Sequence, residues 1–256
     1  MSEIDNNKPK TGGKSKAGGP PTTFSMPMYR QFVPKFIRPW IYLLLAFCFQ
    51  FANGMYLGAM NDVVGEWSMM REDVQMCLYA TLIGMALYFP VLFRMKFRFT
   101  NKSLLMVSAA VIVVCNLLAT IKMPLPALWA LCVVCGMAKI QGTFECMSNI
   151  QLWMTPKRDF GVFFPILHIV LLTSIEGAGY LAAWFAYHMH WTYMHWFVIL
   201  LMLIVLFVQA LLTKPFRAMP QIVPLKGLDW FGALLWIVFW LQVAWLLNYG
   251  DWLDWW

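Results

Sequence analysis

The sequence has little charge for its length, few cysteines and few histidines. Only 12% of the 256 residues are charged, whereas a soluble domain carries roughly 25%. Hydrophobic residues make up 61% of the chain, and the mean hydropathy is +0.64. This composition excludes an ordinary soluble domain and indicates a protein that lies in a lipid bilayer.

Long apolar stretches account for most of the chain. Each runs for about 17 to 28 residues, and a helix needs about 20 to cross a bilayer. They lack the period-two alternation of membrane strands, and helices satisfy their own backbone in lipid. Seven such segments begin near Trp40, Cys77, Leu104, Leu128, Val162, Trp196 and Trp230. The sequence therefore predicts an all-α polytopic membrane protein.

Proline and charge positions set the expected helix ends. The second helix is expected to end near Phe93 and the third near Ile121. The later helices are expected at Leu128–Met154, Val162–Tyr187, Trp196–Leu212 and Trp230–Leu247.

Lysine and arginine are nearly absent from every second gap between the apolar segments. Sixteen of the nineteen basic residues fall in the N-terminal tail or in gaps two, four and six. Arg71 and Lys122 are the two in the other gaps, and Lys139 lies inside a segment. This is the positive-inside pattern of a multi-pass protein with a cytoplasmic N-terminus, as in the inner membrane of a cell. It also accounts for the net charge of +7 without nucleic acid, because a basic tail can lie against anionic lipid.

The few cysteines and histidines form no expected metal or cofactor site. All six cysteines lie in or beside apolar segments, and no second Cys/His cluster accompanies Cys132-x-x-Cys135. That pair has the spacing of a redox motif but lies in mid-helix, which favours a packing role for small residues. We expect no cofactor, no metal and no catalytic residue.

Composition divides the chain into three parts. Residues 1–37 are expected to form a disordered basic cytoplasmic tail, and residues 38–213 a six-helix domain. Residues 214–256 are expected to hold a cytoplasmic connector, a seventh transmembrane helix and the start of an outer loop. The short acidic and aromatic end suggests a fragment of a longer protein.

Polar residues form stripes within the apolar helices. One face of the first helix is expected to carry Gln50, Asn53 and Asn61, and one face of the fourth Gln141, Glu145, Ser148 and Asn149. The fifth carries Thr173, Glu176 and Tyr180 at helical spacing. An ionisable group at such depth costs at least about 2.5 kcal/mol, so it needs a partner or water. Two interpretations stay open: a hydrated pathway, or a structural ion pair of Lys139 with Glu145 or Glu176.

Several short motifs resemble those of one transporter family. The segment Phe93–Lys102 resembles its basic loop between helices 2 and 3, with Arg98 and Lys102 at the motif's basic positions but Phe97 in place of its aspartate. Gln141-Gly142 matches the family's fourth helix, and Ser174–Gly179 occupies the place of its antiporter motif without the Gly-Pro. In order and topology the chain resembles the N-terminal half of a major facilitator superfamily transporter, in the fourteen-helix drug:proton antiporter branch.

The resemblance implies proton-coupled efflux of amphipathic, drug-like molecules by a six-helix bundle with a seventh, linker helix. The expected partners are a small-molecule substrate, protons, the lipid bilayer and, in a Gram-negative cell, a periplasmic adaptor. The expected proton-coupling residues are Glu145, Glu176 and Lys139; the cavity residues are Gln50, Asn53, Asn61, Gln141 and Asn149; the gating loop holds Arg94, Arg98 and Lys102.

Other functions stay open as alternatives. The eroded antiporter motif leaves room for transport of an organic anion or a saccharide. A seven-helix receptor would place its N-terminus outside, against the charge pattern. A membrane-embedded enzyme would need a nucleophile–base pair, and none is evident.

Overall fold

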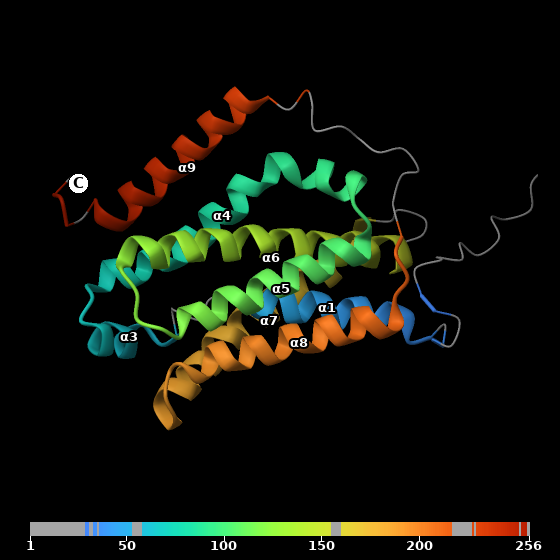
Figure 1. Ribbon diagram of the computed structural model, residues 1–256, viewed down its shortest axis with the longest axis horizontal. Coiled ribbons are helices and arrows are strands. Elements are labelled where there is room, and N and C mark those ends of the chain that lie inside the picture. Colours follow the sequence, from blue (N-terminus) through green and yellow to red (C-terminus); the bar gives the residue numbers. More distant parts are fainter. Residues whose placement is uncertain are drawn as a thin grey trace, which may run out of the picture.

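The computed structural model describes residues 29–30, 33–34, 36–52, 58–154, 160–216, 227, 229–250 and 252–254. Over this part of the chain the regular structure is helical, apart from an isolated antiparallel bridge between Tyr29 and Thr213 (Figure 1). The helices are α1 (Arg38–Phe51), α3 (Met60–Trp67), α4 (Arg71–Arg98), α5 (Asn101–Ala119), α6 (Leu125–Met154), α7 (Phe160–His188), α8 (Tyr193–Leu212) and α9 (Trp230–Tyr249). The predicted all-α fold class is confirmed.

Six helices are long and apolar enough to cross a membrane. They are α4, α5, α6 over Leu125–Gln151, α7, α8 and α9, and the apolar part of α1 over Trp40–Phe51 is shorter. The chain is therefore a multi-pass membrane protein. The division at residues 37 and 213 stays a prediction.

Most helix ends fall within a few residues of those expected from the sequence. The larger differences are in α1, which ends at Phe51 although Asn61 was expected on the same helix, and in α4. Helix α4 begins at Arg71 where the apolar segment was marked from Cys77, and it continues to Arg98 where the sequence favoured an end near Phe93. Only Phe99 and Thr100 then separate α4 from α5. Thr100 caps α5, because its side chain accepts a hydrogen bond from the Ser103 N–H at 3.2 Å.

Helix α6 lies at the centre of the bundle and packs against α1, α4 and α5. Its crossing with α4 depends on two glycines. A methyl group at Gly84 would collide with the Val133 carbonyl oxygen, and one at Gly136 with that of Thr81. Small residues let two membrane helices approach this closely, so the backbones of α4 and α6 meet directly.

Basic residues gather at one end of the bundle, here called the basic end. Hydrogen bonds join the segments there: the Arg30 N–H donates to the Leu212 carbonyl at 3.0 Å, and the Asn101 N–H to that of Phe216 at 2.8 Å. The end of α4, the starts of α1 and α5 and the end of α8 therefore lie together. The basic end also holds Arg38, Arg94, Lys96, Arg98 and Lys102.

The opposite, acidic end holds α3, the start of α4 and the corner between α7 and α8. Glu66 on α3 accepts a hydrogen bond from the Trp191 ring N–H and lies 3.0 Å from His190 Nε2. Trp129 at the start of α6 donates to the Asp73 carbonyl at 3.2 Å. The two ends thus differ in charge as the alternation in the sequence predicts.

Helix α9 stands at the edge of the molecule, beside α4 (Figure 1). Three polar contacts hold it there: Trp236 Nε1 to the Ala86 carbonyl at 2.9 Å, Asn248 Nδ2 to that of Glu72 at 2.8 Å, and Tyr249 OH to the Asp73 carboxylate at 3.1 Å. Its apolar side chains are otherwise largely exposed, as in a helix surrounded by lipid.

Candidate functional site

The most heavily bonded ionisable group of the membrane-spanning helices is Glu145, in the half of α6 near the basic end. Its side chain is 1% exposed. One carboxylate oxygen accepts a hydrogen bond from Gln141 Nε2 at 3.2 Å and the other from Asn101 Nδ2 at 2.9 Å. Asn149 Nδ2 donates to the Glu145 backbone carbonyl at 2.7 Å. The predicted polar face of α6 is thus assembled around this carboxylate.

Lys96 supplies the positive charge opposite Glu145. Its Nζ lies 3.7 Å from Glu145 Oε2, donates to Ser148 Oγ, and lies 4.9 Å from the centre of the Phe144 ring. The Lys96 side chain is 14% exposed. The ion pair therefore lies within the protein, at the last turn of α4.

A second polar layer surrounds the pair. Asn101, at the first turn of α5, bridges Glu145 and the Tyr42 hydroxyl of α1, which lies 3.5 Å from Asn101 Oδ1. The carboxylate of α6 thus contacts α4 and α5 directly, and Asn101 links it to α1. A buried ion pair with its hydrogen bonds satisfied is tolerated, whereas loss of either partner leaves an uncompensated charge that costs about 3–5 kcal/mol. The network, here called the Glu145 network, therefore joins α4 and α5 to α6.

Lys139 and Glu176 do not join the Glu145 network. Lys139 on α6 is 1% exposed, and its Nζ has no hydrogen-bond partner among the described residues. Glu176 on α7 is exposed, as are Thr173 and Tyr180 on the same face. The ion pair of Lys139 with Glu145 or Glu176, left open by the sequence, does not form among these residues, because Glu145 pairs with Lys96.

The expected polar face of the first helix is divided. Gln50 is buried in α1, and its Nε2 donates to Thr143 Oγ1 of α6 at 3.2 Å. Asn61 is exposed on α3, a separate helix, because α1 ends at Phe51. The expectation that one helical face carries Gln50 and Asn61 is therefore wrong. Asn53 lies outside the described residues.

The three residues expected in a gating loop lie instead on helix ends. Arg94 in the last turns of α4 donates to the Gly227 carbonyl at 2.9 Å. Arg98 lies 5.8 Å from the centre of the Phe99 ring. Lys102 donates to the carbonyls of Ala210 and Thr213 at 3.2 and 3.1 Å. A cation at those carbonyls stabilises the C-terminus of α8.

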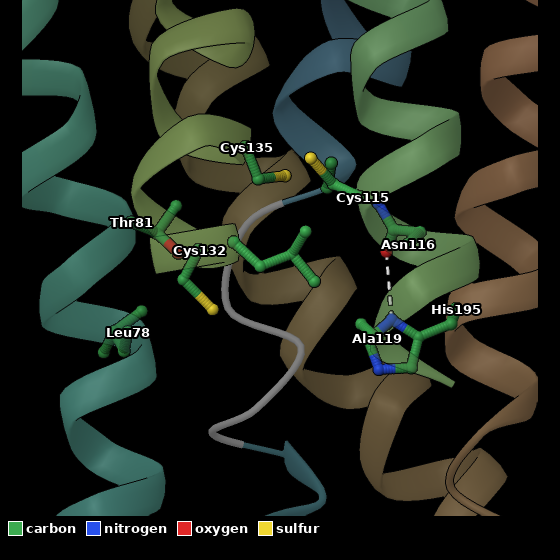
Figure 2. A pocket seen from close by; sticks show the side chains of 10 residues that line it. Leu78, Thr81, Cys115, Asn116, Ala119, Cys132, Cys135 and His195 are labelled. Carbon is green, nitrogen blue, oxygen red and sulfur yellow. Dashed lines mark hydrogen bonds between the residues drawn. The ribbon is translucent and has the colours of Figure 1, made fainter. Parts of the chain in front are cut away.

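A small cavity of about 40 Å³ lies between α4, α5, α6 and α8 (Figure 2). Cys115, Cys132, Cys135, Asn116 and His195 are among the residues that line it. Asn116 Oδ1 lies 3.0 Å from His195 Nδ1, and because an amide oxygen only accepts, Nδ1 carries the proton. In the described part of the chain, no group of three His, Cys, Asp or Glu side chains is placed to hold a metal ion.

Sequence reasoning did not select four residues that complete these contacts: Lys96, Asn101, Thr143 and His195. Lys96 and Asn101 fell in the loop expected between the second and third helices, where basic residues were interpreted as cytoplasmic loop charges. Extending the expected second helix by five residues, to Arg98, places Lys96 in its last turn instead of in a loop.

No protein-family model and no curated protein matches this sequence.

Proposed function

We propose that the chain acts in secondary-active transport at the cell membrane and exports amphipathic small molecules in exchange for protons. The basic end faces the cytoplasm in this proposal, as the positive-inside rule requires. One observation carries it: a carboxylate of α6 that is 1% exposed contacts α4 and α5, and through Asn101 α1, inside a membrane bundle. Ionisable residues at such positions typically mark ion or proton pathways.

The proposed coupling step is protonation of Glu145. A neutral carboxyl group no longer attracts Lys96 and gives up part of its strength as an acceptor from Asn101 and Gln141. The corner between α4 and α5 then loses its tie to α6 and can move toward the cytoplasm. Deprotonation restores the ion pair and closes the basic end. In this mechanism Glu145 acts as a latch, while Gln50 and other polar residues nearer the bundle centre contact substrate.

Export of ethidium from cells that lack their own efflux pumps tests the proposal. The full reading frame should lower ethidium accumulation, and a protonophore should abolish the effect. Glu145→Gln should remove proton-driven export at equal abundance in the membrane. Glu176→Gln is the matched control, because that carboxylate lies outside the network. Export that persists undiminished in Glu145→Gln would contradict the mechanism.

Lys139 favours a second candidate, transport of an organic anion. A buried ammonium without a carboxylate partner among the described residues is the group that an anionic substrate would neutralise. In that case Lys139→Met should abolish uptake or export of a carboxylate such as benzoate and leave ethidium export unchanged.

A further inference from the structure

The two cysteines of Cys132-x-x-Cys135 each meet a thiol from a different helix. Cys115 of α5 and Cys135 of α6 line the same cavity, and Cys132 lies near Cys77 of α4. Figure 2 shows the sulfur atoms of Cys115 and Cys135 pointing toward one another across the space between α5 and α6. Helix packing accounts for small residues at these positions, but it does not account for the paired thiols.

The cavity beside these thiols limits what can reach them. It measures about 40 Å³, and one water needs about 10–15 Å³ of such space. A molecule with two oxygen atoms, such as hydrogen peroxide, fits this space. A tripeptide disulfide such as oxidised glutathione does not.

Lys139 distinguishes Cys135 from the other thiols. It lies one turn beyond Cys135 on the same face of α6, where side chains four residues apart are neighbours. The Lys139 Nζ is buried and has no hydrogen-bond partner among the described residues. An amine that takes the proton of a nearby thiol becomes an ammonium and stabilises the resulting thiolate, which is the nucleophilic form of cysteine. By contrast, Cys77 donates its S–H to the Asp73 carbonyl at 3.6 Å.

We propose that Cys135 and Cys115 form a peroxide-reactive thiol pair in which Lys139 acts as the base for Cys135. Lys139 takes the Cys135 proton, and the thiolate attacks one oxygen of hydrogen peroxide. The O–O bond breaks, the thiolate becomes a sulfenic acid, and the departing hydroxide takes the proton from Lys139 to form water. The Cys115 thiol then displaces water from the sulfenic acid to give a disulfide. In sum, two thiols and one hydrogen peroxide yield one disulfide and two waters, and α5 becomes bonded to α6.

Peptide mapping of the full chain in native membranes tests this proposal. Membranes are treated with hydrogen peroxide, unfolded in a maleimide and digested, and disulfide-linked peptides are identified by mass spectrometry. We expect a Cys115–Cys135 link that returns to free thiols with dithiothreitol. Oxidised glutathione at the same concentration should give at least tenfold less link.

Three variants separate the roles of the residues. Cys115→Ser should leave Cys135 as a sulfenic acid that dimedone traps. Lys139→Met should slow link formation at least tenfold and flatten its dependence on pH, with the protein still folded by its tryptophan fluorescence. Cys132→Ser is the matched control, since it lines the same cavity and should form the link at the wild-type rate.

Three outcomes would overturn the proposal. The first is a link between Cys77 and Cys132 in place of Cys115–Cys135. The second is no oxidation of either Cys115 or Cys135 at peroxide concentrations that oxidise an exposed control cysteine placed at Gly65. The third is an unchanged rate in Lys139→Met.

Discussion

A single carboxylate has more bonding partners than any other acidic side chain described within the bundle. Glu145 accepts from Gln141 and Asn101 and faces Lys96, all inside the protein. Forming a buried ion pair contributes little to stability, because both charges lose their hydration. Removing one partner is strongly destabilising, because the remaining charge is buried with neither water nor an opposite charge.

Lys96→Met should therefore lower the free energy of unfolding by about 3–5 kcal/mol. Adding Glu145→Gln to this variant should restore most of the loss, because no unpaired charge then remains. Thermal unfolding in detergent, followed by the fluorescence of the fourteen tryptophans, measures both variants. Lys122→Met, at an exposed position, is the control and should be neutral within about 0.5 kcal/mol. A double variant no more stable than Lys96→Met would contradict this account.

Sequence reasoning could reach only the part of this site that lies on one helix. Helical spacing places Gln141, Glu145 and Asn149 on one face of α6, and the structure does bring them together around the carboxylate. The partner on α4 depends on how two helices cross and where one ends, and spacing within a single helix does not contain that information. Lys139 illustrates the same limit, since its depth was evident but its lack of a partner among the described residues was not.

At the scale of helices, α4 and α6 pack with their backbones in direct contact. Gly84 and Gly136 each lie against a carbonyl oxygen of the facing helix. Backbone atoms within a helix cannot move aside as a flexible side chain can. Any added atom must therefore push the helices apart.

Gly136→Ala should destabilise the protein by about 1–3 kcal/mol, the range typical of overpacked interiors. Gly65→Ala on α3 is the matched control, because a methyl group there meets no atom within 4 Å. The midpoint of thermal unfolding in detergent measures both. Equal midpoints for the two variants would contradict this account, because they would show that a methyl group fits between α4 and α6 without loss of stability.

Helix α9 should be the least firmly attached of the long helices. Its partner is α4, and its polar contacts include those from Asn248 and Tyr249 to the start of that helix. Replacing both residues, as Asn248→Ala with Tyr249→Phe, removes two hydrogen bonds worth about 0.5–1.5 kcal/mol each. Amide hydrogen exchange should rise in α9 and stay unchanged in α5. A rise spread over both helices would show that α9 unfolds together with the bundle.

Helix lengths were accessible from the sequence because hydropathy extends over whole segments. Predicted and observed bounds of α6 to α9 differ by three residues or fewer at each end. The end of α4 differed more, since Arg94, Lys96 and Arg98 were interpreted as loop charges. Lys96 lies within the bundle because the Glu145 network holds it there.

The molecule as a whole separates basic from acidic ends. Contacts at the basic end bring together residues as distant in sequence as Arg30, Lys102 and Thr213. The acidic end is joined by Glu66 and Trp191. This separation gives the proposed orientation a direct test.

A cysteine at the exposed position Ser103 should react with a membrane-impermeant maleimide only after cells are permeabilised, because the basic end is expected inside. A cysteine at the exposed position Gly65 should react in intact cells. The native cysteines are buried or half-buried, so their background should be low. If the cysteine at Ser103 reacts in intact cells and the cysteine at Gly65 does not, the protein has the opposite orientation.

The two-residue turn between α4 and α5 has one more consequence. Lys96 and Asn101 flank it, so both are tied to Glu145, while Lys102 and the Asn101 backbone bind the end of α8 and Phe216 just beyond it. A change in the protonation of Glu145 can therefore alter the contacts at the point where the chain leaves α8 for the connector to α9. Thermodynamic linkage is reciprocal, so a ligand or protein whose binding at that connector depends on the state of Glu145 must alter how readily Glu145 exchanges its proton. Under the proposed mechanism, the connector is thus a position from which the rate of the transport cycle can be adjusted without contact with either substrate or proton.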